Sequence, residues 1–120
     1  MSMHYGDDGI LRVKIMEGAV IGREQVKMQM ETIERMGIHI PHLALVDARN
    51  DFTITKDGQE TAAAYYHMRI ATAVVTGNPV TRMLSNAYVD IFKPASPVRL
   101  FSNEKDAEAW LIKQMTLVRK

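Results

Sequence analysis

The sequence predicts a single α/β domain, built from four βα units around a mainly parallel sheet with an antiparallel N-terminal hairpin strand. Apolar runs of strand length alternate with segments whose apolar residues recur at helical spacing. The breaks between them are rich in glycine, proline, asparagine and aspartate. A chain of 120 residues is the size of one hydrophobic core. We therefore expect one domain over residues 1–120.

The first predicted elements are a hairpin and a helix. A dense turn signal, Gly6–Gly9, separates a short start at Met3–Tyr5 from an alternating strand over Ile10–Met16. After Gly22 the apolar residues follow helical spacing, which predicts a helix over Arg23–Met36 that the next glycine ends.

Two nearly continuous apolar runs, Leu43–Val46 and Ile70–Val75, predict central strands that are covered on both faces. Between them Thr55 can cap a helix that runs to about His67. Gly58 weakens that helix, because glycine costs about 1 kcal/mol relative to alanine in a helix interior.

Capping residues mark the last two units. Asn78 followed by Pro79 starts a helix that Pro94 ends, because proline at the first helical position lacks only an N–H that has no helical partner. A short strand over Val98–Phe101 follows.

The C-terminal segment is predicted as a helix capped reciprocally by Asn103 and Asp106, with Trp110 on its apolar stripe and largely buried. Strands that alternate with helices pair in parallel through right-handed crossovers. If all helices lie on one face of the sheet, a dimer partner or an apolar ligand must cover the other.

Composition excludes several classes of function. The formal charge of +1 comes from interspersed acids and bases, so we expect no nucleic-acid binding. The absence of cysteine removes disulfides and thiolate sites and fits a cytoplasmic location. No leader pattern or long apolar stretch is present, so neither secretion nor membrane insertion is expected.

Three strings carry a family resemblance: Arg69–Val75 with the following Asn78-Pro79, then Pro97–Phe101, then Ala107–Leu111. With the order of units, they resemble the SpoIIAA-like superfamily of STAS and SEC14-type domains, and in particular small stand-alone bacterial members of uncharacterised function. The resemblance implies a βα superhelical fold. For better understood relatives it implies regulation of protein–protein contacts by a phosphorylation switch at the start of the second helix, and for SEC14-type relatives lipid binding.

The switch of the regulatory relatives is an Asp-Ser-Ser/Thr-Gly string, and the equivalent string here is Thr55-Lys56-Asp57-Gly58. Asp57 stands where the resemblance places the phosphoacceptor, so we expect no phosphorylation there, and only Thr53 or Thr55 could substitute. A carboxylate at a helix N-terminus is favourable by about 0.3–1 kcal/mol without any regulatory role.

Loops after parallel strands meet at the carboxyl edge of the sheet, where open α/β folds bind ligands. Three charged residues after the first central strand are either a self-neutralising surface cluster or a polar contact site. Helix N-termini at the same edge could hold an anion, although capping alone explains their residues. The candidate ligand or partner contacts are Asp47, Arg49, Asn50, Asp51, Thr55, Asp57, Thr76 and Asn78.

We expect no metal site, no cofactor and no catalytic activity. His39 and His42 form a His-x-x-His string, but in an extended segment residues three apart point to opposite faces. No nucleophile elbow, phosphate-binding loop or dinucleotide-binding turn is present. The hypothesis that remains is a non-catalytic regulatory or scaffold module that binds a protein partner, in particular itself as a homodimer. The alternative is a carrier or sensor of a small lipid or other apolar ligand.

Overall fold

The computed structural model describes residues 2–38, 41–65, 68–77 and 96–119. Within them the main sheet has five strands, of which the first pairs antiparallel with its neighbour and the others are parallel. The predicted α/β class and the N-terminal hairpin are confirmed. The strands follow in the spatial order β1 (Ser2–Tyr5), β2 (Ile10–Lys14), β4 (His42–Asp47), β6 (Arg69–Val75) and β7 (Val98–Phe101).

The hairpin turn is fixed by its glycines and one aspartate. The Gly9 N–H donates to the carbonyl of Gly6 at 3.1 Å, and the Gly6 N–H donates to the carbonyl of Ile10 at 3.1 Å. Gly9 has a φ of +80°, a conformation that residues with a Cβ rarely adopt. The Asp8 carboxylate accepts from the N–H of Ile10 at 3.1 Å. The turn therefore sets the register of β1 on β2.

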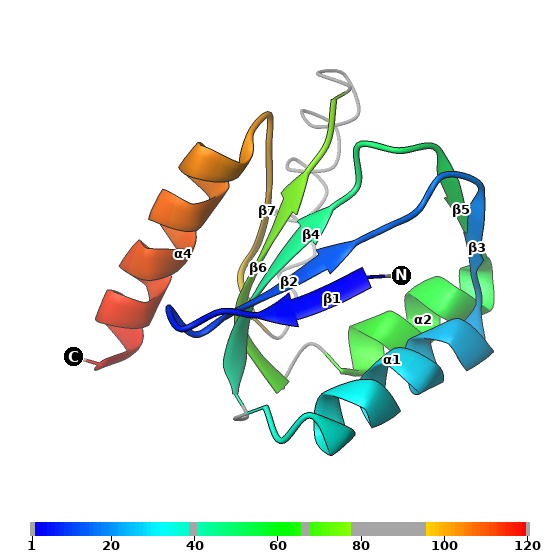
Figure 1. Cartoon of the computed structure of the whole chain (residues 1–120), viewed down its shortest axis with the longest axis horizontal. Helices are drawn as coiled ribbons and strands as arrows, with labels where there is room; N and C mark the ends of the chain where they lie inside the picture. The colour runs from blue at the N-terminus through cyan, green and yellow to red at the C-terminus, as the bar shows by residue number, and fades with distance from the viewer. Residues whose placement is uncertain (1, 39–40, 66–67, 78–95, 120) are drawn as a thin grey trace.

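Helices cover both sides of the sheet (Figure 1): α1 (Arg23–Arg35) and α2 (Lys56–Ala64) lie on one side, and α4 (Glu104–Arg119) lies on the other. We call these the α1–α2 side and the α4 side. A partner or ligand was expected to cover a bare face only if all helices lay on one face, and that condition is not met, because α4 covers the face opposite α1 and α2. The helix predicted from Asn78 to Pro94 lies outside the described residues. No described helix combines the length and apolar character needed to cross a membrane.

The two sides have separate apolar clusters because successive strand residues point to opposite faces. On the α4 side, small alanines of β6 let the helix approach closely. Its buried residues are Ile10, Leu43, Leu45, Ala71, Ala73, Val75, Ala107 and Leu111. On the α1–α2 side the buried residues next to α1 are Leu11, Val13, Ile33 and Ile38.

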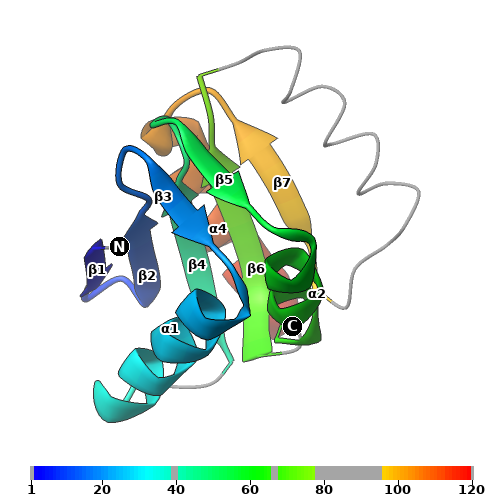
Figure 2. The same cartoon turned by 90° about the vertical axis from the view of Figure 1, so that its right-hand side faces the viewer.

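A second, two-stranded sheet was not foreseen. The strands β3 (Ala19–Ile21) and β5 (Phe52–Ile54) pair in parallel and stand before α1 and α2, respectively (Figure 2). Each has three residues, too few to show an alternating pattern. Ile21 is buried with residues of the neighbouring segments, so this ribbon joins the carboxyl ends of β2 and β4 to the helices that follow.

Gly58 has a packing reason inside α2. A Cβ at this position would lie 2.4 Å from the carbonyl oxygen of Ile21 in β3, closer than real Cβ contacts allow. Glycine lowers the helix propensity of this segment, but its lack of a Cβ permits the close approach of α2 to the ribbon. The helix ends at Ala64, short of the predicted end near His67, which lies outside the described residues.

The cap of α4 has the predicted reciprocal form. Asn103 Oδ1 accepts from the N–H of Asp106 at 2.9 Å, and Asn103 Nδ2 donates to the Asp106 carboxylate at 3.1 Å. One turn further, Trp110 is partly buried and its ring centroid lies 5.6 Å from that of Phe101. Because β7 is the edge strand among the described residues, Trp110 is less enclosed than Leu111.

Candidate functional site

Three charged side chains form a cluster at the carboxyl end of β4, which we call the carboxyl-end cluster: Asp47, Arg49 and Glu104. Arg49 Nε and Nη2 donate to the two carboxylate oxygens of Asp47 at 2.9 and 2.8 Å. Arg49 Nη2 also donates to the Glu104 carboxylate at 2.9 Å. One guanidinium thus joins the end of a central strand to the first turn of α4.

The electrostatics of this cluster favour the ionised forms of Asp47 and Arg49. The hydrogen bonds from the Arg49 side chain hold the pKa of Asp47 below its usual range, because their effect is larger than the opposing effect of burial. The same contact raises the pKa of Arg49. The geometry is that of the self-neutralising alternative, since both Asp47 oxygens already accept from Arg49. That Asp47 and Arg49 contact a ligand or partner stays a prediction.

Other predicted contacts at this edge tie loops together. Asn50 Nδ2 donates to the carbonyl of Ile15 at 3.1 Å, and the N–H of Asp51 donates to the Glu17 carboxylate at 3.2 Å. Thr76 is buried after β6, and its N–H donates to the carbonyl of Phe101 at 3.0 Å. Asn78 lies outside the described residues.

The remaining predicted residues, Thr55 and Asp57, belong to a different place, the amino end of α2. Thr55 Oγ1 accepts from the N–H of Gly58 at 3.1 Å, so its predicted role as the cap is confirmed. The same hydroxyl donates to the Asp57 carboxylate, and this hydrogen bond lowers the pKa of Asp57. The predicted site thus divides into two regions.

A shallow hollow of about 450 Å³ lies where the amino ends of α1 and α2 meet beside β3, and we call it the ribbon hollow. Val20 of β3 stands at it with 59% of its surface exposed. Charges of both signs surround it, and Arg23 is close enough to Asp57 to contribute to its lowered pKa. The lining residues are Val20, Gly22, Arg23, Glu24, Gln25, Thr55 and Asp57.

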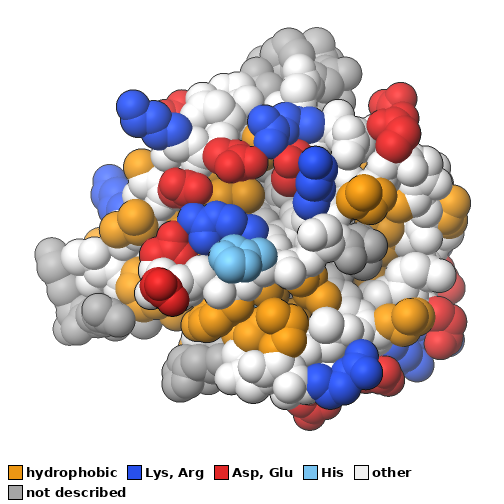
Figure 3. All heavy atoms as spheres, viewed as in Figure 1, with side chains coloured by type: hydrophobic (Ala, Val, Ile, Leu, Met, Phe, Trp, Pro, Cys, Tyr) orange, Lys and Arg blue, Asp and Glu red, His pale blue; other side chains and the backbone are white. Residues whose placement is uncertain are grey.

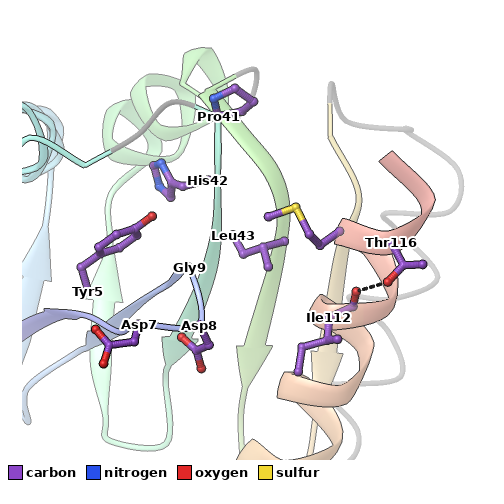
Figure 4. Close-up of a pocket in the computed structure, with 10 residues that line it drawn as sticks. Tyr5, Asp7, Asp8, Gly9, Pro41, His42, Leu43, Ile112 and Thr116 are labelled. Carbon is purple, nitrogen blue, oxygen red and sulfur yellow. Dashed lines mark hydrogen bonds between the residues drawn. The ribbon is translucent and has the colours of Figure 1, made fainter. Parts of the chain in front are cut away.

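A second hollow, also about 450 Å³, lies at the opposite end of the sheet, and we call it the amino-end hollow. It runs between the hairpin turn, the start of β4 and the last turns of α4 (Figure 4). On the face of the molecule shown in Figure 3, hydrophobic side chains gather below a band of charged ones. The lining residues are Tyr5, Asp7, Asp8, Gly9, Pro41, His42, Leu43, Ile112, Met115 and Thr116.

Arg12 does not line this hollow, but it forms ion pairs with two carboxylates at or near it. Arg12 Nη2 donates to the carboxylates of Asp8 and Glu108 at 2.8 and 3.1 Å. Its side chain lowers the pKa of Asp8, and the two acids together raise the pKa of Arg12. The amino-end hollow was not foreseen because three segments far apart in the chain form it. The local signals in the sequence were the paired aspartates of the turn and His42 of the His-x-x-His string.

His42 of the His-x-x-His string is 3% exposed and borders the amino-end hollow, whereas His39 lies outside the described residues. Within the described parts of the chain, no group of three or more histidine, aspartate or glutamate side chains is arranged to hold a metal ion.

The sheet order and the placement of the helices are those of a SpoIIAA-like fold. An uncharacterised protein of the DUF3478 family from Shewanella loihica PV-4, described as having a SpoIIAA-like fold, matches with a TM-score of 0.67. The match covers 92% of this chain and 90% of that one at 16% identity, and so establishes the fold alone. A protein of unknown function from Arthrobacter sp. FB24 is 28% identical over 92% of this chain and 97% of its own, with a TM-score of 0.34.

A family model matches residues 4–115, which is nearly the whole chain. The protein belongs to the family described as "Domain of unknown function (DUF7793)". No curated protein matches the sequence.

Proposed function

We propose that this protein is a non-catalytic regulatory module that works by protein–protein contact, first of all with a second copy of itself. The contact surface is the ribbon hollow with the exposed residues of the loop and strand before α1. The single observation that carries the proposal is Val20, a β-branched apolar residue with 59% of its surface exposed, at the rim of a polar hollow.

The charges around Val20 suit a symmetric contact. In a twofold dimer the same surface meets itself, so it must carry groups that complement one another. The ribbon hollow supplies a cation at Arg23 and carboxylates at Glu24 and Asp57. Met16, in the loop before β3, adds a flexible apolar side chain that is 49% exposed.

The lowered pKa values of three described carboxyl groups argue against these groups as general bases. A general base works best when its pKa lies near the working pH. Every described carboxyl group with a shifted pKa, namely Asp8, Asp47 and Asp57, has it lowered, away from neutrality. These carboxylates are held by arginine or threonine partners and stabilise the fold.

The oligomeric state tests the proposal directly. The wild-type protein should sediment as a dimer at high micromolar concentration, and Val20→Asp should sediment as a monomer with unchanged circular dichroism. Leu117→Asp is the matched control, because Leu117 is 53% exposed on α4 and should leave the dimer intact. A wild-type protein that stays monomeric would end the self-association proposal, and a dimer that survives Val20→Asp would move the interface elsewhere.

A second candidate function, the carrying or sensing of an apolar ligand, is favoured by the apolar wall of the amino-end hollow. Leu43, Ile112 and Met115 line it, and its volume is within the range of small-molecule sites. Native mass spectrometry of freshly purified protein tests this candidate. A bound mass that denaturation releases supports it, and a ligand-free spectrum counts against it.

A further inference from the structure

We propose that the amino-end hollow binds a small organic cation, an amine carried on a short apolar body. This inference rests on the second candidate function and narrows its ligand class. It is independent of the ribbon hollow, which lies at the other end of the molecule's strands.

The apolar side chains that line the hollow favour a ligand with a short apolar body. Leu43 forms a buried floor, and Met115 is a partly buried side chain that packs on the same cluster. Ile112 lies at the mouth with 54% of its surface exposed, directly after the fully buried Leu111. A ligand body in the hollow would remove this apolar surface from water, and the favourable free energy of that burial is roughly proportional to the area removed.

The charges around the hollow call for a cation. Its lining residues, within the described part of the chain, include the carboxylates of Asp7 and Asp8 and no lysine or arginine. The nearby guanidinium of Arg12 is shared between Asp8 and Glu108. Among these four described side chains, three carboxylates, those of Asp7, Asp8 and Glu108, are therefore matched by one guanidinium. An anionic ligand such as a phosphate would be repelled, and a charged amine attracted.

Two further side chains suit an ammonium group. Tyr5 lies at one side of the hollow with its hydroxyl directed toward His42 in this view (Figure 4). Its ring face can attract a cation and its oxygen can accept a hydrogen bond. Thr116 Oγ1 donates to the carbonyl of Ile112 at 3.2 Å, so its own lone pairs face outward as acceptors. The polar groups of the hollow thus offer oxygen acceptors more than donors.

Three probes that share an apolar body and differ in charge test the inference: phenethylamine, phenethyl alcohol and hydrocinnamate. Each is titrated into the full-length protein, and binding is followed by two-dimensional amide NMR. Phenethylamine should bind about tenfold more tightly than hydrocinnamate, because exposed carboxylates attract the first and repel the second. The amides of Gly9, Ile112 and Thr116 should shift most.

Matched variants separate charge from shape. Asp7→Asn should weaken phenethylamine about threefold and leave phenethyl alcohol unchanged, whereas Glu60→Gln removes a distant charge and should change neither. Ile112→Ser should weaken phenethylamine and phenethyl alcohol alike by about fivefold, whereas Leu117→Ser, at a similarly exposed position outside the hollow, should change neither.

The outcomes distinguish this inference from the candidate function beneath it. If phenethyl alcohol or hydrocinnamate binds as tightly as phenethylamine, the hollow takes apolar ligands and the inference about charge is wrong. If none of the three shifts the named amides, both the inference and the small-ligand function fail at this site. If phenethylamine shifts other amides and leaves those of Gly9, Ile112 and Thr116 unchanged, it binds at a different place and the assignment to the amino-end hollow is wrong.

Discussion

The two sides of the sheet are closed by different means. On the α4 side, one helix is held by an apolar cluster and by two arginines of the sheet region, each of which bridges to a glutamate of the helix. On the α1–α2 side, α2 approaches the β3–β5 ribbon so closely that a Cβ on Gly58 would meet backbone. Both sides have apolar clusters, but the α4 side adds ion pairs between side chains and the α1–α2 side adds close backbone packing.

The α4 side itself changes along the helix. Glu104 and Glu108, one turn apart, take part in two similar sets in which an arginine lies between two acids. At the next turn of α4, Ile112 stands in the position of the acid, and no bridging arginine contacts it among the described residues. Here the contact between α4 and the sheet gives way to the amino-end hollow. The amino-end hollow therefore begins where the charged links between helix and sheet stop.

The largest expected effect comes from breaking the α4 side at its core. Leu111 is fully buried, so Leu111→Ala should lower the free energy of unfolding by about 2–5 kcal/mol through lost burial and a cavity. Ile112→Ala, the neighbouring residue with 54% exposure, should cost less than about 1 kcal/mol. Urea unfolding followed by circular dichroism measures both. Equal losses would mean that α4 is not docked as described.

A smaller effect is expected at the edge of the same cluster. Trp110 is only partly buried, so Trp110→Ala should cost about 2 kcal/mol, below the 3–5 kcal/mol of an enclosed aromatic residue. Its fluorescence should shift to the red on unfolding, because the ring leaves its contact with Phe101 and becomes exposed to water. Loss of 4 kcal/mol or more, on the scale of fully buried aromatics, would show that further side chains enclose the ring.

The α1–α2 side is tested by the smallest possible substitution. Gly58→Ala should destabilise by about 1–2 kcal/mol, because overpacking against Ile21 outweighs the gain in helix propensity. Gly77→Ala is the matched control, since no atom of the described residues lies within 4 Å of a Cβ built there. If Gly58→Ala stabilises the protein, the approach of α2 to β3 is looser than described, and the contrast between the two sides disappears.

These elements also separate what the sequence could predict from what it could not. The central strands, α1 and the cap of α4 were predictable because continuous apolar runs, helical spacing and cap residues act within a few neighbours. The ribbon was missed because strands of three residues carry no period. The packing of Gly58 on Ile21 is invisible in sequence, where glycine in a helix is only a penalty.

The candidate site was less predictable than the fold. Asp47 and Arg49 were correctly placed together, since only Ala48 separates them in the chain and the strand ends there. Their partner Glu104 is 55 positions from Arg49, and Glu108 is 96 positions from Arg12. Whether a charge near a strand end is neutralised or left for a ligand is therefore decided by tertiary contacts.

The smallest expected effect compares the two arginine sets through pH. The pKa values of Asp8 and Asp47 are lowered in the folded protein, chiefly by Arg12 and Arg49, respectively. A lowered folded-state pKa contributes stability above the unfolded value of 3.8, and that stability is lost as pH falls through the folded pKa. The protein should therefore lose stability on acidification from about pH 5 downward. Each set contributes less than about 1 kcal/mol, because its groups are partly exposed and screened.

The two sets should not contribute equally. The side chain of Asp47 is 15% exposed and that of Asp8 is 41% exposed, so solvent screens the Asp8 contact more strongly. Asp47→Asn should therefore flatten the acid limb of the stability curve more than Asp8→Asn does, and added salt should weaken the Asp8 set first. Urea midpoints measured across the acid range, at low and high salt, give both comparisons. A larger flattening by Asp8→Asn would mean that the hairpin, rather than the carboxyl end of β4, carries the stronger ionic link between the sheet and α4.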